Sequence, residues 1–259
     1  MDFGIAGRKA IVCASSRGLG KACARALAEA GCEVVINGRD AKTLAATAAE
    51  LSKITGAKVI AVAADVATPE GQKALLAACP QPDILINNNA GPPLRDFREL
   101  SRQQMIEGVT ANMIVAIELI QKVIDPMMAK KFGRIVNITS GAVKAPLAGL
   151  DLSSGARAGL TAFLAGVART VANKNVTINN ILPGAFDTDR LRGTLAKAAE
   201  KGNKTVEQAA TDRMATIPAR RFGEPAEFGA AAAFLCSTQA GYITGQNLLI
   251  DGGLFPGAF

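Results

Sequence analysis

A glycine-rich turn near the N-terminus is the first stretch of the sequence that could do chemistry. It reads CASSRGLGKA over residues 13–22, between the apolar run KAIVCAS (9–15) and the alanine-rich segment GKACARALAEAG (20–31). In such a turn the backbone N–H groups can approach a pyrophosphate, and the start of the following helix adds a favourable field for an anion. A tight turn that only packs a helix on a strand has the same composition.

Arg39 stands where a dinucleotide site would meet the adenosine ribose. It follows Gly38 at the end of the apolar run EVVING (33–38). A carboxylate at this place would accept a hydrogen bond from the ribose 2′-hydroxyl, whereas an arginine accommodates a 2′-phosphate. Arg17, in the turn, could join Arg39 around that phosphate. The pattern favours NADP(H) over NAD(H), and the alternative is a solvated arginine partly neutralised by Asp40.

Short apolar runs alternate with longer amphipathic segments along the whole chain. The expected strands are 9–15, 33–38, 58–66, 83–91, 133–140, 176–184 and 246–253, and the expected helices are 20–31, 41–56, 70–79, 105–130, 155–173 and about 225–238. This alternation predicts an α/β protein: one doubly wound parallel sheet (a Rossmann fold) with helices on both faces. We expect a single domain over 1–259, in which the polar segment 185–224 forms a flap on the substrate side, over the edge of the sheet.

The composition excludes several kinds of chemistry. The chain has no histidine, so no imidazole can act as a general base or bind a metal. Its five cysteines are scattered and form no CxxC motif, which indicates reduced thiols and no metal site. The N-terminus lacks the layout of a signal peptide, and no apolar run is long enough to span a membrane. We therefore expect a cytoplasmic protein without a membrane partner.

The net charge of +7 does not indicate a nucleic-acid partner. Lysine and arginine are spread along the chain, and no basic run is interleaved with aromatic residues. An anionic cofactor or substrate is the remaining explanation for the excess of positive charge.

Taken together, the motifs resemble those of the short-chain dehydrogenase/reductase superfamily along nearly the whole chain. The turn CASSRGLG is similar to the family's TGxxxGxG, with Cys13 and Ala14 in place of its threonine and first glycine. The segments DV (65–66), NNAG (88–91), PGAFDT (183–188) and the tail 220–253 match further family motifs. With Arg39, the resemblance implies cofactor contacts at Ala14, Ser15, Ser16, Arg17, Gly18, Leu19, Gly20, Asp65, Val66, Asn89, Ala90, Gly91, Pro183, Gly184 and Thr188. Within the family the chain is most similar to 3-oxoacyl-carrier-protein reductases.

The same resemblance implies the catalytic residues, and two of them are exchanged. Asn112 falls on the family's catalytic asparagine and Ser140 on its catalytic serine. The family's YxxxK motif places its tyrosine thirteen residues after that serine, where this chain has Ser153, and its lysine where this chain has Arg157. Tyr242, the only tyrosine, lies in the tail and cannot take that place in this alignment.

The exchange removes the usual proton donor. A tyrosine suits proton transfer because its pKa is near 10 and a neighbouring cation lowers it, whereas the hydroxyl of Ser153 is far less acidic and has a shorter reach. Arg157 keeps the positive charge and can bind ribose hydroxyls, but it does not release a proton near neutral pH. The alternatives are that Ser153 only fills space and that Arg157 is a structural ion-pair partner. Lys144 could replace the missing acid if burial lowers its pKa towards neutrality. The alternative is that Lys144 is only a solvated lysine of a loop. Asp151 would need a strongly raised pKa.

Two hypotheses follow from these residues. The first is an NADP(H)-dependent oxidoreductase with an altered active site, acting on a carbonyl/alcohol pair or an activated C=C bond. The second is a catalytically silent NADP(H)-binding homologue that acts as a sensor or as an inactive partner subunit. The positive charges of the flap favour an anionic or thioester substrate, against the alternative that they are only solvated. The apolar faces of 105–130 and 155–173 and the family resemblance predict a homotetramer.

Overall fold

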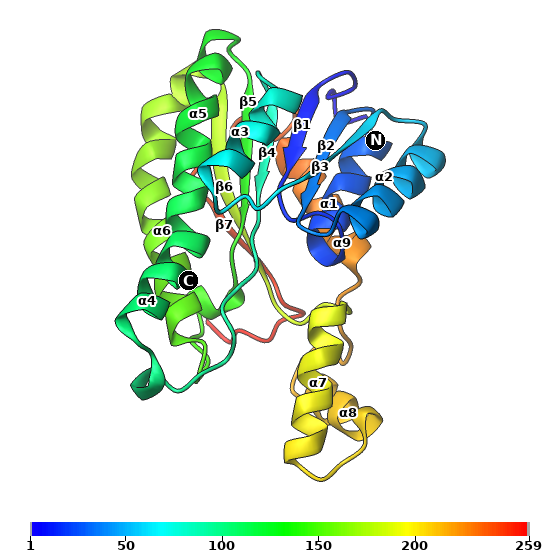
Figure 1. Cartoon of the computed structure of the whole chain (residues 1–259), viewed down its shortest axis with the longest axis vertical. Coiled ribbons are helices and arrows are strands. Elements are labelled where there is room, and N and C mark those ends of the chain that lie inside the picture. The colour runs from blue at the N-terminus through cyan, green and yellow to red at the C-terminus, as the bar shows by residue number, and fades with distance from the viewer. Residues whose placement is uncertain (1, 258–259) are drawn as a thin grey trace.

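A seven-stranded parallel sheet forms the centre of the molecule (Figure 1). The structure is a computed structural model that describes residues 2–257. The strands follow the order β3-β2-β1-β4-β5-β6-β7, so the direction of winding reverses between β1 and β4. Their bounds are β1 Lys9–Val12, β2 Glu33–Gly38, β3 Val59–Ala63, β4 Ile84–Asn87, β5 Gly133–Ile138, β6 Val176–Pro183 and β7 Asn247–Ile250. The predicted α/β fold with a doubly wound parallel sheet is confirmed.

Helices cover both faces of the sheet and bury a separate core on each. On one face pack α1 (Gly18–Glu29), α2 (Ala41–Thr55) and α9 (Pro225–Cys236), and on the other pack α3 (Pro69–Ala78), α5 (Val115–Ala129) and α6 (Asp151–Val171). Strand β1 supplies both cores alternately, because Ala10 and Val12 point to one face and Ile11 to the other. Val12 lies beside Ile36 of β2 and Ile86 of β4, which places the end of β1 at the centre of the sheet.

The long helix expected over 105–130 is divided into three parts. It consists of α4 (Arg102–Val109), a π-helical turn over Thr110–Ile114 and α5, with Pro126 inside α5. A π-helical turn adds one residue to a helical turn and is often found at functional sites. Here it contains Asn112, which is buried. Helix α6 begins four residues earlier than expected, so Ser153 and Arg157 lie in its first two turns.

The segment 185–224 forms two helices that project from the rest of the molecule (Figure 1). They are α7 (Asp189–Lys201) and α8 (Val206–Ala215), and they bury Leu195, Ala199 and Ala209. Side chains of Thr188 and Thr205 cap their N-termini. In the described residues 2–257, no helix is both long and apolar enough to cross a membrane, and no group of three or more His, Cys, Asp or Glu residues could hold a metal ion.

Ala14 has a backbone conformation that favours glycine. Its φ is +44°, in the left-handed region, at the position where the resemblance expects a glycine. Such a conformation costs an L-residue about 1–2 kcal/mol, which a glycine would not incur. Part of this stabilisation is offset, because glycine has more conformational freedom to lose when the chain folds. We expect Ala14→Gly to raise the free energy of unfolding by about 0.5–1 kcal/mol in urea denaturation.

A matched control is Ala46→Gly, in the interior of α2, where the alanine is exposed and helical. It should lower the free energy of unfolding by about 1 kcal/mol. If Ala14→Gly destabilised the protein as much as this control does, the strain assigned to Ala14 would be refuted.

Candidate active site

The glycine-rich turn is fixed to the end of β2 by two of its own amides. The N–H of Ala14 donates to Asn37 Oδ1 (3.3 Å) and the N–H of Ser15 to the Asn37 carbonyl (2.7 Å). The Ser15 hydroxyl is buried and donates to the Val12 carbonyl (2.6 Å). Ala14 and Ser15 were expected among the cofactor contacts, but their amides and the Ser15 hydroxyl already donate to other groups of the protein. The amides that remain for an anion are those of residues 16–20.

Helix α1 presents an open N-terminus to this turn. Arg17, the N-cap residue, makes no side-chain capping bond, and the first turn contains no acidic residue. The unsatisfied N–H groups and the helix dipole therefore favour an anion at this point. Gly20 must be a glycine, because a Cβ there would lie 2.3 Å from the Ala14 carbonyl oxygen. This close packing brings the start of α1 onto the end of β1.

The two arginines expected at the adenosine end carry no carboxylate partner within residues 2–257. The Arg17 guanidinium donates to Thr43 Oγ1 (3.0 Å), and Arg39 is exposed. Asp40 caps α2 by accepting from the Thr43 N–H; its pKa is lowered first by its hydrogen bonds with Thr43 and then by the charge of Arg17. Asp40 thus forms no ion pair with Arg39. An open helix start beside two arginines fits a dinucleotide that carries an extra phosphate.

Gly38 leaves space for the turn at the end of β2. A Cβ on Gly38 would lie 3.0 Å from Ser16 Oγ, so a larger side chain there would be tightly packed against the turn. At the end of β3, Asp65 Oδ1 accepts from the Ala67 N–H (2.9 Å) and Val66 is buried.

Three segments from the carboxyl ends of β1, β4 and β6 meet at one edge of the sheet. Asn89 donates to the Ala111 carbonyl (3.2 Å), which ties the segment Asn89–Gly91 to the π-helical turn. Pro183 ends β6 and is followed by Gly184, where a Cβ would lie 2.6 Å from the Asp251 Cβ. Thr188 lies against Gly18, since a Cβ there would be 3.7 Å from Thr188 Cγ2. This is the switch point at which ligands of doubly wound sheets bind.

Ser140 and Asn112, the two expected catalytic residues that are retained, come from the end of β5 and from the π-helical turn. Ser140 follows β5, and its Oγ accepts from the Ala142 N–H (3.1 Å), so its own proton stays free to be donated. Asn112 donates to the Gly108 carbonyl (3.3 Å), while its buried Oδ1 has no hydrogen-bond partner within the described chain. A buried acceptor without a partner costs free energy, which favours a donor or a water at this place.

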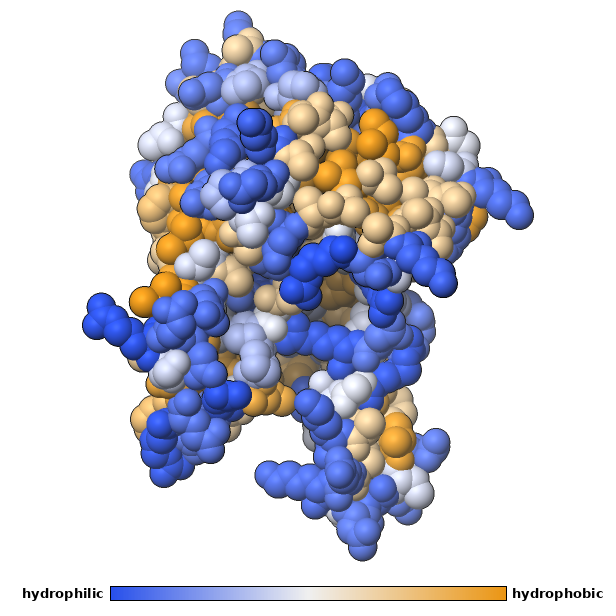
Figure 2. Space-filling view, in the orientation of Figure 1, coloured by the Kyte–Doolittle hydropathy of each residue, from blue (hydrophilic) through white to orange (hydrophobic). Residues whose placement is uncertain are grey.

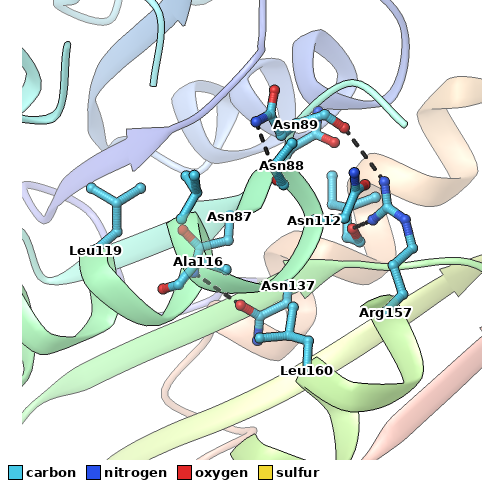
Figure 3. Close-up of a pocket in the computed structure, with 12 residues that line it drawn as sticks. Asn87, Asn88, Asn89, Asn112, Ala116, Leu119, Asn137, Arg157 and Leu160 are labelled. Carbon is cyan, nitrogen blue, oxygen red and sulfur yellow. Dashed lines mark hydrogen bonds between the residues drawn. The ribbon is translucent and has the colours of Figure 1, made fainter. Parts of the chain in front are cut away.

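Arg157 links two strand ends to helix α6. Its Nη1 donates to the Ile138 carbonyl (2.7 Å), its Nη2 to the Asn89 carbonyl (3.5 Å), and its Nε to Ser153 Oγ (3.3 Å). Both side chains are buried, with Ser153 5% and Arg157 7% exposed. In Figure 3 the guanidinium points toward Asn89 and Asn112. The residue at the lysine position is therefore held rigidly in place as a cation.

Two causes together lower the pKa of Arg157 from 12.5 to about 10: burial, which has the larger effect, and the positive charge of Arg190. Arg157 nevertheless stays protonated at neutral pH. Arg190 lies close by, because a Cβ on Gly91 would be 2.9 Å from its Nη2. The sequence analysis placed Arg190 among the flap charges and missed it as a site residue. Its position two residues after Thr188, an expected cofactor contact, could have indicated that Arg190 lies near the site.

Lys144 and Asp151 take other positions. The Lys144 ammonium lies 5.6 Å from the centre of the Phe255 ring, in a cation–π contact. Asp151 is the exposed first residue of α6. The structure gives neither group a hydrogen bond or ion pair with Ser140, Ser153 or Arg157.

Two hollows adjoin the site. A small cavity of about 20 Å³, large enough for one water, is bordered by Asn112, Arg157 and the asparagines at the ends of β4 and β5 (Figure 3). A larger pocket of about 280 Å³ lies between the segment 90–95, helix α4 and Leu152. Figure 2 shows the surface hollowed between the sheet and the α7–α8 pair, with hydrophilic side chains around the opening.

Comparisons with known proteins agree with this geometry. A family model described as enoyl-(acyl carrier protein) reductase matches residues 13–255. The chain is 32% identical to the 3-oxoacyl-[acyl-carrier-protein] reductase FabG of Vibrio cholerae, over 96% of this chain and 98% of that protein. It is 31% identical to the NADPH-dependent reductase BacG of Bacillus subtilis, over 95% and 97% of the two chains.

A solved structure of similar shape is L-sorbose reductase from Gluconobacter frateurii in complex with NADPH and L-sorbose. It has a TM-score of 0.94 and 28% identity and covers 99% of this chain and 100% of that chain. The match to the family model spans more than half of the chain, and the curated relatives align over nearly all of it. The chain therefore belongs to the short-chain dehydrogenase/reductase family of oxidoreductases.

Proposed function

We propose that the protein is an NADP(H)-dependent oxidoreductase acting on a carbonyl/alcohol pair, in which a fixed guanidinium replaces the usual tyrosine and lysine. The observation that carries the proposal is Arg157. Its three hydrogen bonds hold a permanent cation between the ends of β4 and β5, on the carbonyl of Ile138 two residues before Ser140. Asn112 and Ser140 have no evident use in a protein that only binds a dinucleotide.

The choice of NADP(H) rests on the phosphate-binding groups at and near residues 16–20, which we call the cofactor cradle. The amides of this turn, the open start of α1, and the unpaired Arg17 and Arg39 would hold the phosphates. Asp65 would meet the adenine, and Asn89, Gly91 and Thr188 the nicotinamide side. Two relatives support the assignment, because BacG is an NADPH-dependent reductase and L-sorbose reductase was solved in complex with NADPH. When bound, the cofactor supplies the hydride.

The chain's own residues would bind and polarise the carbonyl. Ser140 Oγ accepts from a backbone N–H, so its hydroxyl proton can be donated to the carbonyl oxygen. Ser153 accepts from Arg157 Nε, so its proton can be donated as well. The buried charge of Arg157 favours the negative charge that develops on that oxygen. Since no group here is a strong acid at neutral pH, the proton of the product comes from solvent, relayed by a serine hydroxyl.

We also propose a homotetramer and a cytoplasmic location. Ile114 and Phe163 are large apolar side chains on the π-helical turn and α6 that are 40% and 47% exposed. Tyr242 and Leu248 are exposed beside β7 and on it. Exposed apolar side chains of this size are what an assembly of several copies would cover.

The first test concerns the cofactor. Arg39→Ala should weaken NADPH binding about tenfold to a hundredfold and leave NADH binding unchanged, because only NADPH carries the 2′-phosphate that Arg39 would bind. Isothermal titration calorimetry with both cofactors measures this difference. Arg25→Ala, which removes an exposed arginine paired with Glu29 on α1, serves as the control and should change neither affinity. Equal losses for NADPH and NADH would refute the assignment.

The second test concerns the missing acid. The double variant Ser153→Tyr/Arg157→Lys should reduce carbonyl substrates about a hundredfold faster than the natural chain, since a positioned acid contributes about 10²–10⁴-fold. Initial rates of NADPH oxidation over a panel of ketones and 3-oxo esters measure this, and Arg157→Lys alone is the control. Ser140→Ala should remove the activity of both proteins.

If the double variant folds and binds NADPH but gains no rate, the pocket is not a carbonyl-reducing pocket. Tight NADPH binding without turnover by any variant would instead identify the protein as a silent dinucleotide-binding homologue.

A further inference from the structure

Two guanidinium groups lie at the active site without a carboxylate partner. Neither Arg157 nor Arg190 takes part in any ion pair formed within residues 2–257. Arg192, two residues further along the same helix as Arg190, shows the contrast, because it pairs with both Asp187 and Asp189. Arg192 therefore has its charge compensated by acidic neighbours, whereas Arg190 on the same helix does not.

Burial makes the charge of Arg157 costly. The side chain is 7% exposed, and its three hydrogen bonds go to two carbonyls and one hydroxyl, none of which is charged. Removing an ion from water is unfavourable unless an opposite charge compensates it. A guanidinium has five N–H groups, so two N–H groups of Arg157 remain for a further acceptor. Its pKa is lowered by burial and by Arg190, and a bound anion would act against both causes.

Both arginines lie along one short segment next to the reacting groups. Arg157 donates to the carbonyl of Asn89, and Arg190 meets Gly91 two residues later. Arg157 also donates to Ile138, two residues before Ser140. An anionic group held by both guanidinium groups would lie along the segment Asn89–Gly91, close to the end of β5 that Ser140 follows.

We propose that Arg157 and Arg190 together bind a carboxylate of the substrate, so that the protein reduces an oxo acid in preference to a neutral ketone or thioester. This inference rests on the proposed reductase function and assigns its substrate class. Two arginines are well suited to a carboxylate, because their planar N–H groups match its two oxygens. It also separates this chain from its relatives described as 3-oxoacyl-carrier-protein reductases, whose carbonyl neighbours a thioester.

The reaction balances as follows. A hydride passes from NADPH to the carbonyl carbon of the oxo acid, and the C=O π pair becomes a lone pair on the oxygen, which takes one proton from solvent. NADPH is oxidised to NADP⁺ and the carbonyl is reduced to an alcohol. The carboxylate forms and breaks no bond and keeps its charge, so its role is to bind and orient the substrate.

The experiment compares matched acids and esters. Initial rates of NADPH oxidation are measured with 2-oxo and 3-oxo acids and with their methyl esters, and the ratio of kcat/KM for acid over ester is taken for each pair. We expect the natural chain to prefer the best acid at least tenfold, and Arg190→Gln to lower this ratio about tenfold, as expected for one lost charge-assisted hydrogen bond. Arg192→Gln, on the same helix and ion-paired, should keep the preference.

Binding is measured separately from turnover. Saturation-transfer NMR with the NADP⁺ complex should show contact with the free acids, reduced in Arg190→Gln, and weaker contact with the esters. If acids bind in this way but no compound is turned over, the carboxylate site stands and the proposed reductase function fails. Three results would overturn the inference. The acid-to-ester ratio could be unchanged in Arg190→Gln, or esters could bind as well as acids. Arg190→Gln could also lose NADPH affinity in parallel, which would assign Arg190 to a cofactor phosphate.

Discussion

The guanidinium of Arg157 is the constraint on which the active site depends. It donates to the ends of two neighbouring strands through the carbonyls of Ile138 and Asn89, and to Ser153 of its own helix. A lysine, with one ammonium group, could not span these acceptors in the same fixed plane. Burying this charge is unfavourable, and the charge lies at the edge of the sheet where a fold of this kind binds its ligands. This position indicates that the charge takes part in binding or catalysis.

The rest of the fold keeps this point fixed. Two cores, one on each face of the sheet, hold the strands in register, and full burial of a side chain such as Leu27 or Leu160 contributes about 2 kcal/mol to stability. Asn37 holds the glycine-rich turn through the amides of Ala14 and Ser15, so the amides left for an anion are those of residues 16–20. The cofactor cradle and the cation at Arg157 are therefore parts of one rigid edge of the sheet.

Much of this arrangement could be predicted from the sequence, because it follows from local patterns. The strand 33–38 was predicted with its observed bounds, and the glycine turn, Asp65 and Thr188 lie at the sheet edge where the motifs indicated. The π-helical turn at 110–114 was missed, since a long apolar segment with helical periodicity does not reveal one inserted residue.

Contacts between distant parts of the chain could not be predicted either. Asn37 accepts hydrogen bonds from the amides of Ala14 and Ser15, which precede it by 23 and 22 residues. Arg190 contacts Gly91 across the sheet edge. It belongs to the segment 185–224, whose many charges look in the sequence like those of an ordinary solvent-exposed surface. Such pairings depend on how the strands are ordered in space.

The central claim is that hydride transfer here proceeds beside a permanent cation and without a titrating acid. The most direct measurement is the pH dependence of kcat between pH 7 and 9, for the natural chain and for Ser153→Tyr/Arg157→Lys. Arg157, with a pKa of about 10, and the two serines keep their protons over this range, so kcat of the natural chain should be constant. In the variant, kcat for reduction should fall as pH rises, because a phenol beside a lysine loses its proton. An ionisation in the natural chain within this range would show that another group supplies the proton and would contradict the account.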